Sequence, residues 1–199
     1  MSSAARRDKP LHLGLTLVGF AGVAGVFLPF TYDYSPLRAV GESDLWKLGA
    51  PFFLSVFVAI ASLRWITSGR FSRAERVASY TLSVLTAGVI LWMWVEVIGP
   101  RPRIDDWGFI LIPPVTFLTA VFLVIVGSIN GGARGFSPVA ALQVPYLGNC
   151  LLLLIEFARH WQLGAWFSLI TASAYVLQIF LIRARPGALL GEVAASGIE

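Results

Sequence analysis

Long runs of apolar residues alternate with short polar segments along the whole chain. Each run is about 20 residues long, which is the length that an α-helix needs to cross the hydrocarbon core of a bilayer. The runs that meet this condition cover residues 11–30, 48–66, 77–99, 107–129, 138–157 and 161–182. Helices are required, because an open strand would leave backbone hydrogen-bonding groups unpaired in lipid. The pattern therefore predicts an all-α integral membrane bundle of six transmembrane helices.

The composition agrees with a lipid-facing exterior. Hydrophobic residues make up 57% of the 199-residue chain and charged residues 13%, and the mean hydropathy is +0.76. A water-soluble globule of this size needs more polar surface than this chain provides. Because the spans and their short loops use most of the chain, we expect one transmembrane domain over residues 1–199. The last residues, 186–199, have no sustained apolar period and are expected to form a flexible cytoplasmic tail.

Basic residues are distributed unevenly between the two sides of the predicted bundle. The side that carries both termini has ten of them: Arg6, Arg7, Lys9, Arg64, Arg70, Arg73, Arg76, Arg134, Arg183 and Arg185. The other side has five: Arg38, Lys47, Arg101, Arg103 and Arg159. Cytoplasmic loops of membrane proteins carry an excess of Lys and Arg. We therefore expect both termini in the cytoplasm, in a bacterial cytoplasmic (inner) membrane, and we attribute the net charge of +4 to this bias rather than to nucleic-acid binding.

The first apolar run contains a strip of small residues. Gly14, Ala21, Gly22 and Gly25 lie close to one face, and the spacing of Ala21 and Gly25 is the small-xxx-small pattern that lets two membrane helices approach closely. The sequence favours packing inside this bundle over an interface with a second protein. The basic start of the chain also resembles a signal peptide, but the apolar run is longer than usual for one, so we interpret it as a span.

Two of the predicted spans carry polar residues at helical spacing. The residues that share one face are Gln143, Tyr146 and Asn149 in 138–157, and Ser168, Thr171, Tyr175 and Gln178 in 161–182. Pro145 removes a backbone donor from the first of these helices and predicts a bend there. If the two faces meet, they line a groove for a small polar or amphipathic ligand. The alternative, which the sequence favours, is interhelical hydrogen bonding that satisfies polar groups in lipid.

Two acidic residues lie near the external ends of their spans. Glu96 and Glu156 are candidates for ion or proton handling, because an ionisable group near hydrocarbon is costly unless it is solvated or paired. The preferred interpretation is pairing at the membrane surface. Arg101 and Arg103 are the expected partners of Glu96, and Arg159 and His160 are the expected partners of Glu156.

No catalytic pattern accompanies the spans. The chain lacks H-E-x-x-H, C-x-x-C and the phosphate-binding G-x-x-x-x-G-K-[ST], so we expect no catalytic residues, no cofactor and no metal. A capping box of Ser72 and Glu75 predicts that the third helix begins near Arg73.

The leading functional hypothesis is a noncatalytic subunit or assembly partner of a larger membrane complex. Its expected partners are the lipid bilayer and other membrane subunits or a second copy of the chain, without nucleic acid. The alternative is a small-molecule binding or transport component that uses the groove between the fifth and sixth spans. In length and number of spans the chain is similar to the substrate-binding membrane subunits of energy-coupling-factor vitamin importers. This similarity concerns architecture and assigns no residue.

Overall fold

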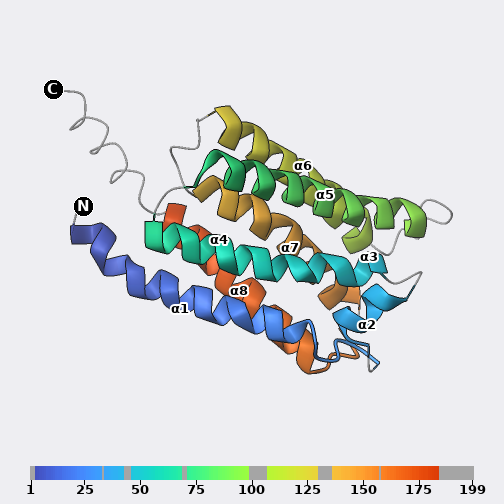
Figure 1. The fold of residues 1–199 in the computed structure, drawn as a ribbon. Coiled ribbons are helices and arrows are strands. Elements are labelled where there is room, and N and C mark those ends of the chain that lie inside the picture. The colour runs from blue at the N-terminus through green and yellow to red at the C-terminus, as the bar shows by residue number, and fades with distance from the viewer. Residues whose placement is uncertain are drawn as a thin grey trace.

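The computed structural model describes residues 3–32, 34–42, 46–68, 71–98, 107–129, 136–156 and 158–183. Within these residues every long element is a helix (Figure 1). In chain order the helices are α1 (Ser3–Gly25), α2 (Pro36–Gly41), α3 (Trp46–Gly49), the 3-10 helix η1 (Ala50–Phe53), α4 (Leu54–Ser68), α5 (Arg73–Ile98), α6 (Trp107–Ile129), α7 (Phe136–Glu156) and α8 (Leu163–Arg183). The all-α class predicted from the sequence is confirmed for this part of the chain. The predicted tail at 186–199 lies outside the described residues.

Five helical segments of the described chain are long and apolar enough to cross a membrane. They are Trp46–Ser68, Arg73–Met93, Ile110–Ile129, Pro138–Ile155 and Leu163–Leu181. The run expected at 11–30 is shorter as a helix, because its apolar part covers only Pro10–Gly25 and the chain turns after it. After Gly25 the backbone makes i→i−3 bonds from Val26, Phe27 and Leu28, and Pro29 has no N–H with which to continue the helix.

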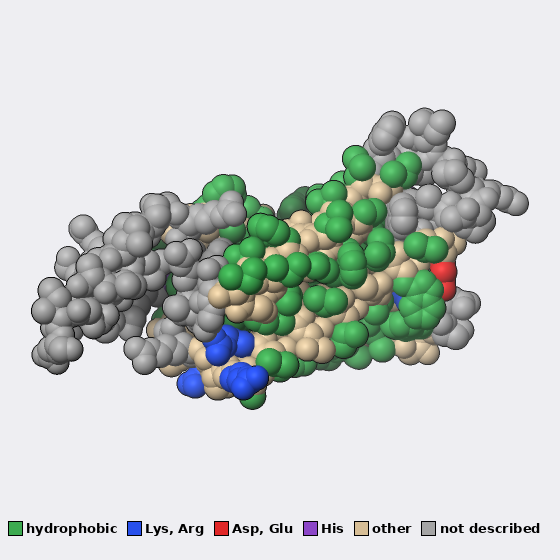
Figure 2. Space-filling view, turned by 90° about the horizontal axis from the view of Figure 1, so that it is seen from above, with side chains coloured by type: hydrophobic (Ala, Val, Ile, Leu, Met, Phe, Trp, Pro, Cys, Tyr) green, Lys and Arg blue, Asp and Glu red, His purple; other side chains and the backbone are tan. Residues whose placement is uncertain are grey.

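The exterior of the bundle is apolar, and much of its polarity is inside. On α6, Leu118, Phe122 and Ile129 are 65%, 61% and 77% exposed, whereas Gln143 of α7 and Gln178 of α8 are completely buried. Figure 2 shows apolar side chains over most of one face, with a group of Lys and Arg side chains at one end. An exterior with so many exposed large apolar side chains is unusual for a water-soluble protein and fits a lipid environment.

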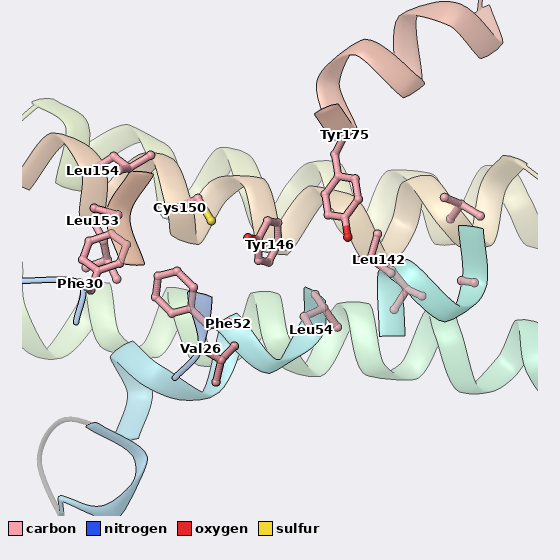
Figure 3. Packing of buried hydrophobic residues seen from close by; sticks show 14 residues of the cluster. Val26, Phe30, Phe52, Leu54, Leu142, Tyr146, Cys150, Leu153, Leu154 and Tyr175 are labelled. Carbon is pink, nitrogen blue, oxygen red and sulfur yellow. The ribbon is translucent and has the colours of Figure 1, made fainter. Parts of the chain in front are cut away.

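Helix α7 lies at the centre of the bundle. Of its apolar segment, 78% is buried, compared with 22% for α6. Figure 3 shows the apolar core around it, where Tyr146 and Cys150 of α7 lie near Phe52 of η1 and Tyr175 of α8. The fold therefore places α7 in contact with α4, α5, α6 and α8.

Helices α1 and α8 run antiparallel in close contact. A Cβ at Gly19 would lie 2.7 Å from the ring of Tyr175, and a Cβ at Gly22 would lie 2.7 Å from Thr171. Because the numbers fall along α8 as they rise along α1, the start of α1 and the end of α8 lie at the same end of the bundle (Figure 1). A larger side chain at either position would force the Tyr175, Thr171 or Tyr146 side chain to move, so the small residues favour close packing of the two helices.

The small residues predicted on α1 do not all share this contact. Gly22 and Gly25 face α8, and Ala21 is half-buried, but a Cβ at Gly14 would have no neighbour within 4 Å. Gly19, which the sequence pattern did not single out, takes part in the contact instead.

The proline inside α7 does not end the helix. Pro145 has no backbone N–H, so the carbonyl of Ala141, four residues earlier, loses its helical partner. The buried hydroxyl of Ser83 on α5 donates a hydrogen bond to that carbonyl. Side-chain hydroxyls commonly satisfy backbone groups that proline frees in membrane helices. Ser83 therefore ties α5 to α7 at the point where the α7 ladder is interrupted.

The loop between α4 and α5 matches the predicted capping box. The backbone N–H of Ser72 donates to the Glu75 carboxylate at 2.6 Å, and the backbone N–H of Glu75 donates to the Ser72 hydroxyl at 3.2 Å. Arg64 at the end of α4 forms an ion pair with the same carboxylate at 3.1 Å. These contacts begin α5 at Arg73, as the sequence predicted, and join its first turn to α4.

We expect Ser83→Ala to lower the free energy of unfolding by about 1–3 kcal/mol, because it leaves the buried carbonyl of Ala141 unpaired. Reversible unfolding in mixed detergent micelles measures this change. Ser173→Ala is the matched control, because the exposed Ser173 hydroxyl donates only to Leu169 O of its own helix at 2.8 Å. The control is expected to stay within about 0.5 kcal/mol of the wild type. Equal effects of the two substitutions would contradict the assignment.

Candidate functional site

The polar residues predicted on two faces lie inside the bundle. All of them are at most 1% exposed: Gln143, Tyr146 and Asn149 from α7, and Ser168, Thr171, Tyr175 and Gln178 from α8. The two faces meet at two levels. Gln143 Nε2 donates to Gln178 Oε1 at 2.8 Å, and the rings of Tyr146 and Tyr175 pack edge to face with their centroids 5.5 Å apart. These seven residues, together with Thr16 and Ser62 described next, are called the polar core.

One end of the polar core is hydrogen-bonded across four helices. Gln178 Oε1 accepts from Gln143 and also from Ser62 Oγ of α4 at 3.5 Å, and Gln178 Nε2 donates to Thr16 Oγ1 of α1 at 3.5 Å. Both Thr16 and Ser62 are completely buried. The sequence analysis missed these two residues, since each is an isolated small polar residue in its helix.

The rest of the polar core contains buried polar atoms that have no hydrogen-bond partner among the described residues. These atoms include Tyr146 Oη, Asn149 Oδ1 and Nδ2, Ser168 Oγ and Thr171 Oγ1. An unpaired buried polar group costs about 1–3 kcal/mol, so such groups in native proteins are normally paired with water or with a ligand. At the Gln178 end both amide atoms of Gln178 are paired, but Gln143 Oε1 also lacks a partner among the described residues.

Helix α1 covers the polar core on one side. The Tyr146 and Thr171 hydroxyl oxygens lie 2.9 Å and 3.0 Å from the position that a Cβ would take at Gly22. Ser168 Oγ lies 3.8 Å from the corresponding position at Gly25. The hydroxyls from α7 and α8 thus converge on the bare backbone of α1. The glycines place three of the unpaired hydroxyls beside one helix.

The polar core carries no formal charge. Its members have only hydroxyl and carboxamide side chains, and the buried residues of the described chain include no Asp, Glu, Lys or Arg. Burying an ion there would leave its charge uncompensated, which is strongly unfavourable. The polar core therefore offers hydrogen-bond donors and acceptors without a formal charge.

The acidic candidates lie away from the polar core or are not described. Glu96 is 46% exposed and forms an ion pair with Lys47 of α3, whose Nζ also lies 4.5 Å from the ring centroid of Trp92. The expected partners Arg101 and Arg103 lie outside the described residues, as does the side chain of Glu156, the last residue of α7. Within the described chain, no group of three or more His, Cys, Asp or Glu residues could hold a metal ion.

No family model matches the chain, and no curated protein or solved structure matches it. The functional argument is therefore carried by the residues of the polar core.

We expect Gln178→Leu to lower the free energy of unfolding by about 1–3 kcal/mol, because it leaves buried groups of Gln143, Ser62 and Thr16 without their partner. The double variant with Gln143→Leu should lower the free energy of unfolding by less than the sum of the two single changes, since neither partner of the hydrogen bond then remains. We expect a coupling of about 0.5–3 kcal/mol from a double-mutant cycle measured by unfolding in detergent. A parallel cycle with Ser173→Ala should show no coupling. Additive behaviour of the two glutamines would contradict the observed pairing.

Proposed function

We propose that this protein is a noncatalytic multi-pass membrane protein that binds or transports a small uncharged polar molecule in the polar core between α7 and α8. The observation that carries the proposal is Asn149, which is completely buried and whose two amide atoms have no hydrogen-bond partner among the described residues, together with the buried, unpaired hydroxyl of Ser168. A solute with several hydroxyl or amide groups would pair with these atoms, which lipid chains cannot do.

The chemistry of the polar core supports a solute of this kind. Asn149 offers two donors and one acceptor oxygen, and each hydroxyl donates one hydrogen bond and accepts others. Interhelical pairing, the alternative interpretation, accounts for the Gln178 end, where Gln143, Ser62 and Thr16 are its partners. It does not account for Asn149, which is completely buried and has both amide atoms unpaired among the described residues.

We further propose that α1 is a sixth span and that both ends of the chain face the cytoplasm of a bacterium. The apolar part of α1, Pro10–Gly25, is about 24 Å long at 1.5 Å per residue and lies antiparallel to α8. Its first turns lie near the end of α4, because the His12 and Trp65 ring centroids are 4.9 Å apart. Arg64 is beside Trp65 at that end, and the excess of basic residues there supports a cytoplasmic location.

The outer face of α6 favours a second candidate function, a subunit or assembly partner of a membrane complex. Six large apolar residues recur there at alternating intervals of four and three, and all are between 51% and 77% exposed: Leu111, Val115, Leu118, Phe122, Ile125 and Ile129. This seven-residue repeat is the pattern by which one helix packs along another. A helix of another subunit, or a second copy of this chain, would cover it.

Native mass spectrometry of the protein extracted in mild detergent tests the first proposal. We expect the wild-type protein to retain a non-lipid small molecule, seen as a measured mass larger than that of the polypeptide. Asn149→Leu and Thr171→Val should each lose it, because they remove hydrogen-bonding groups from the polar core without a large change of volume. Thr81→Val is the matched control, since Thr81 lies on the exposed side of α5, and it should retain the molecule.

Two results would contradict the binding proposal. One is a wild-type spectrum that shows the polypeptide alone, together with a higher melting temperature for Asn149→Leu than for the wild type. This result would mean that the unpaired groups only destabilise the packing and bind no ligand. The other is retention of the molecule by both polar-core variants. Recovery of other polypeptides in fixed ratio would support the subunit candidate.

Reporter fusions test the proposed topology. Two reporters are fused in turn before α1 and after α8, one that is active only in the cytoplasm and one that is active only outside it. At both positions we expect activity from the cytoplasmic reporter and none from the other. A reporter inserted at Gly41, at the end of α2, should give the opposite result. Opposite compartments for the two ends of the chain would mean five crossings and would remove α1 from the set of spans.

A further inference from the structure

A cavity of about 170 Å³ lies beneath α2, between this short helix, the loop after α1, the segment of α3 and η1, and α7. We call it the α2 cavity. Its wall residues include Phe30, Thr31, Leu48, Phe52 and Leu153. Figure 3 shows Phe30 and Leu153 together at one end of the apolar core, with Phe52 on the side toward Tyr146.

Backbone hydrogen bonds hold the walls of the α2 cavity in place. Phe30 N donates to Tyr34 O at 2.6 Å and Tyr34 N donates to Thr31 O at 2.7 Å, which closes the loop after α1 on itself. Leu37 N of α2 donates to Val26 O at 3.1 Å, and this bond fixes α2 over the loop. The cavity is therefore preformed, and a ligand would not have to order its walls on binding.

The size and chemistry of the cavity define a narrow class of ligand. No charged side chain is among its wall residues, whose surfaces are aromatic and aliphatic. An apolar cavity of about 150 Å³ is large enough to bind benzene. The α2 cavity has a similar volume but is partly open at the protein surface, so it has room for one ring of about that size, and a charged group would be unfavourable against its apolar wall.

One polar group in the wall is unpaired. Thr31 is 8% exposed, and its hydroxyl oxygen has no hydrogen-bond partner among the described residues. Because a threonine hydroxyl and methyl exchange places by rotation about χ1, the hydroxyl can be presented to the cavity. An unpaired buried hydroxyl in an apolar wall selects a ligand with one hydrogen-bonding group over a pure hydrocarbon.

We propose that the α2 cavity binds a single uncharged ring compound that carries one hydroxyl or carbonyl group, with Thr31 as the hydrogen-bonding residue. This site is separate from the polar core. Phe52 lies between the two, since it lines the cavity and its ring packs edge to face on Tyr146 with centroids 6.5 Å apart. The proposal therefore does not depend on ligand binding by the polar core.

Fluorine NMR of the protein in lipid nanodiscs tests this proposal with two probes of equal shape, 4-fluorophenol and fluorobenzene. Titration measures the dissociation constant of each probe, with empty nanodiscs giving the background from lipid. We expect both probes to bind saturably to the wild-type protein and 4-fluorophenol to bind about threefold to tenfold more tightly, the effect of one hydrogen bond.

Two variants separate the site from nonspecific uptake. Leu48→Trp places an indole in the cavity and should abolish saturable binding of both probes. Thr31→Val should retain fluorobenzene binding and remove the preference for 4-fluorophenol, while leaving the melting temperature unchanged or raised because it deletes an unpaired hydroxyl. Thr86→Val is the matched control, since Thr86 lines an apolar groove between α4 and α5 and should keep the wild-type preference.

Several outcomes would overturn the proposal. Binding no stronger than in empty nanodiscs would remove the site, and unchanged binding by Leu48→Trp would place the probes elsewhere. An unchanged preference in Thr31→Val would show that the hydroxyl does not select the ligand. Displacement of both probes by raising the lipid-to-protein ratio would mean that an acyl-chain end occupies the cavity instead.

Discussion

The hydrocarbon core of a bilayer cannot hydrogen-bond with the polar groups of the chain. The rest of the structure depends on this constraint. Every buried donor and acceptor in a membrane bundle must find its partner in another part of the protein, in water or in a ligand. The Ser83 hydroxyl meets this requirement for the carbonyl that Pro145 frees in α7, and Gln178 meets it for groups on three other helices. The same constraint makes Asn149 informative, because its two amide atoms are buried without a partner among the described residues. A hydroxyl or amide in water would need no such explanation.

The structure depends secondly on the close approach of its helices, which positions the polar groups. In lipid no hydrophobic force presses helices together, so contact depends on how near the backbones can come. The glycines of α1 allow α8 to lie against bare backbone, and Gly22 in particular leaves room for the Tyr146 and Thr171 hydroxyls. On the other side of α7, a Cβ at Gly148 would lie 2.2 Å from Thr116 Oγ1, so α6 approaches in the same way. Small residues thus bring the polar groups of α7 and α8 into one enclosed region.

The sequence predicted what depends on periodicity and missed what depends on contacts between distant segments. Apolar run length placed α6 at 107–129, as observed, and helical spacing found the polar faces of α7 and α8. The first run was drawn past Gly25, because most residues from Val26 to Phe30 are also apolar, although the helix has already ended. Thr16 and Ser62 could not be found, since nothing in their own helices marks them until Gln178 lies between them. Likewise, the pairing of Glu96 with Lys47 joins residues far apart in the chain, whereas the expected arginines were sequence neighbours.

The exterior and the interior of this protein constrain function to different degrees. An apolar stripe such as that on α6 is satisfied equally by lipid chains and by a partner helix, because both offer the same dispersion contacts and no hydrogen bonds. The interior is more selective, since an unpaired carboxamide is satisfied only by a molecule with matching donors and acceptors. Phe30, Phe52, Tyr146 and Tyr175 form a continuous row of rings between the α2 cavity and the polar core, with successive centroids 5.3, 6.5 and 5.5 Å apart. These rings separate a region that accepts one hydrogen-bonding group from a region that offers several, so the two sites would select chemically different molecules.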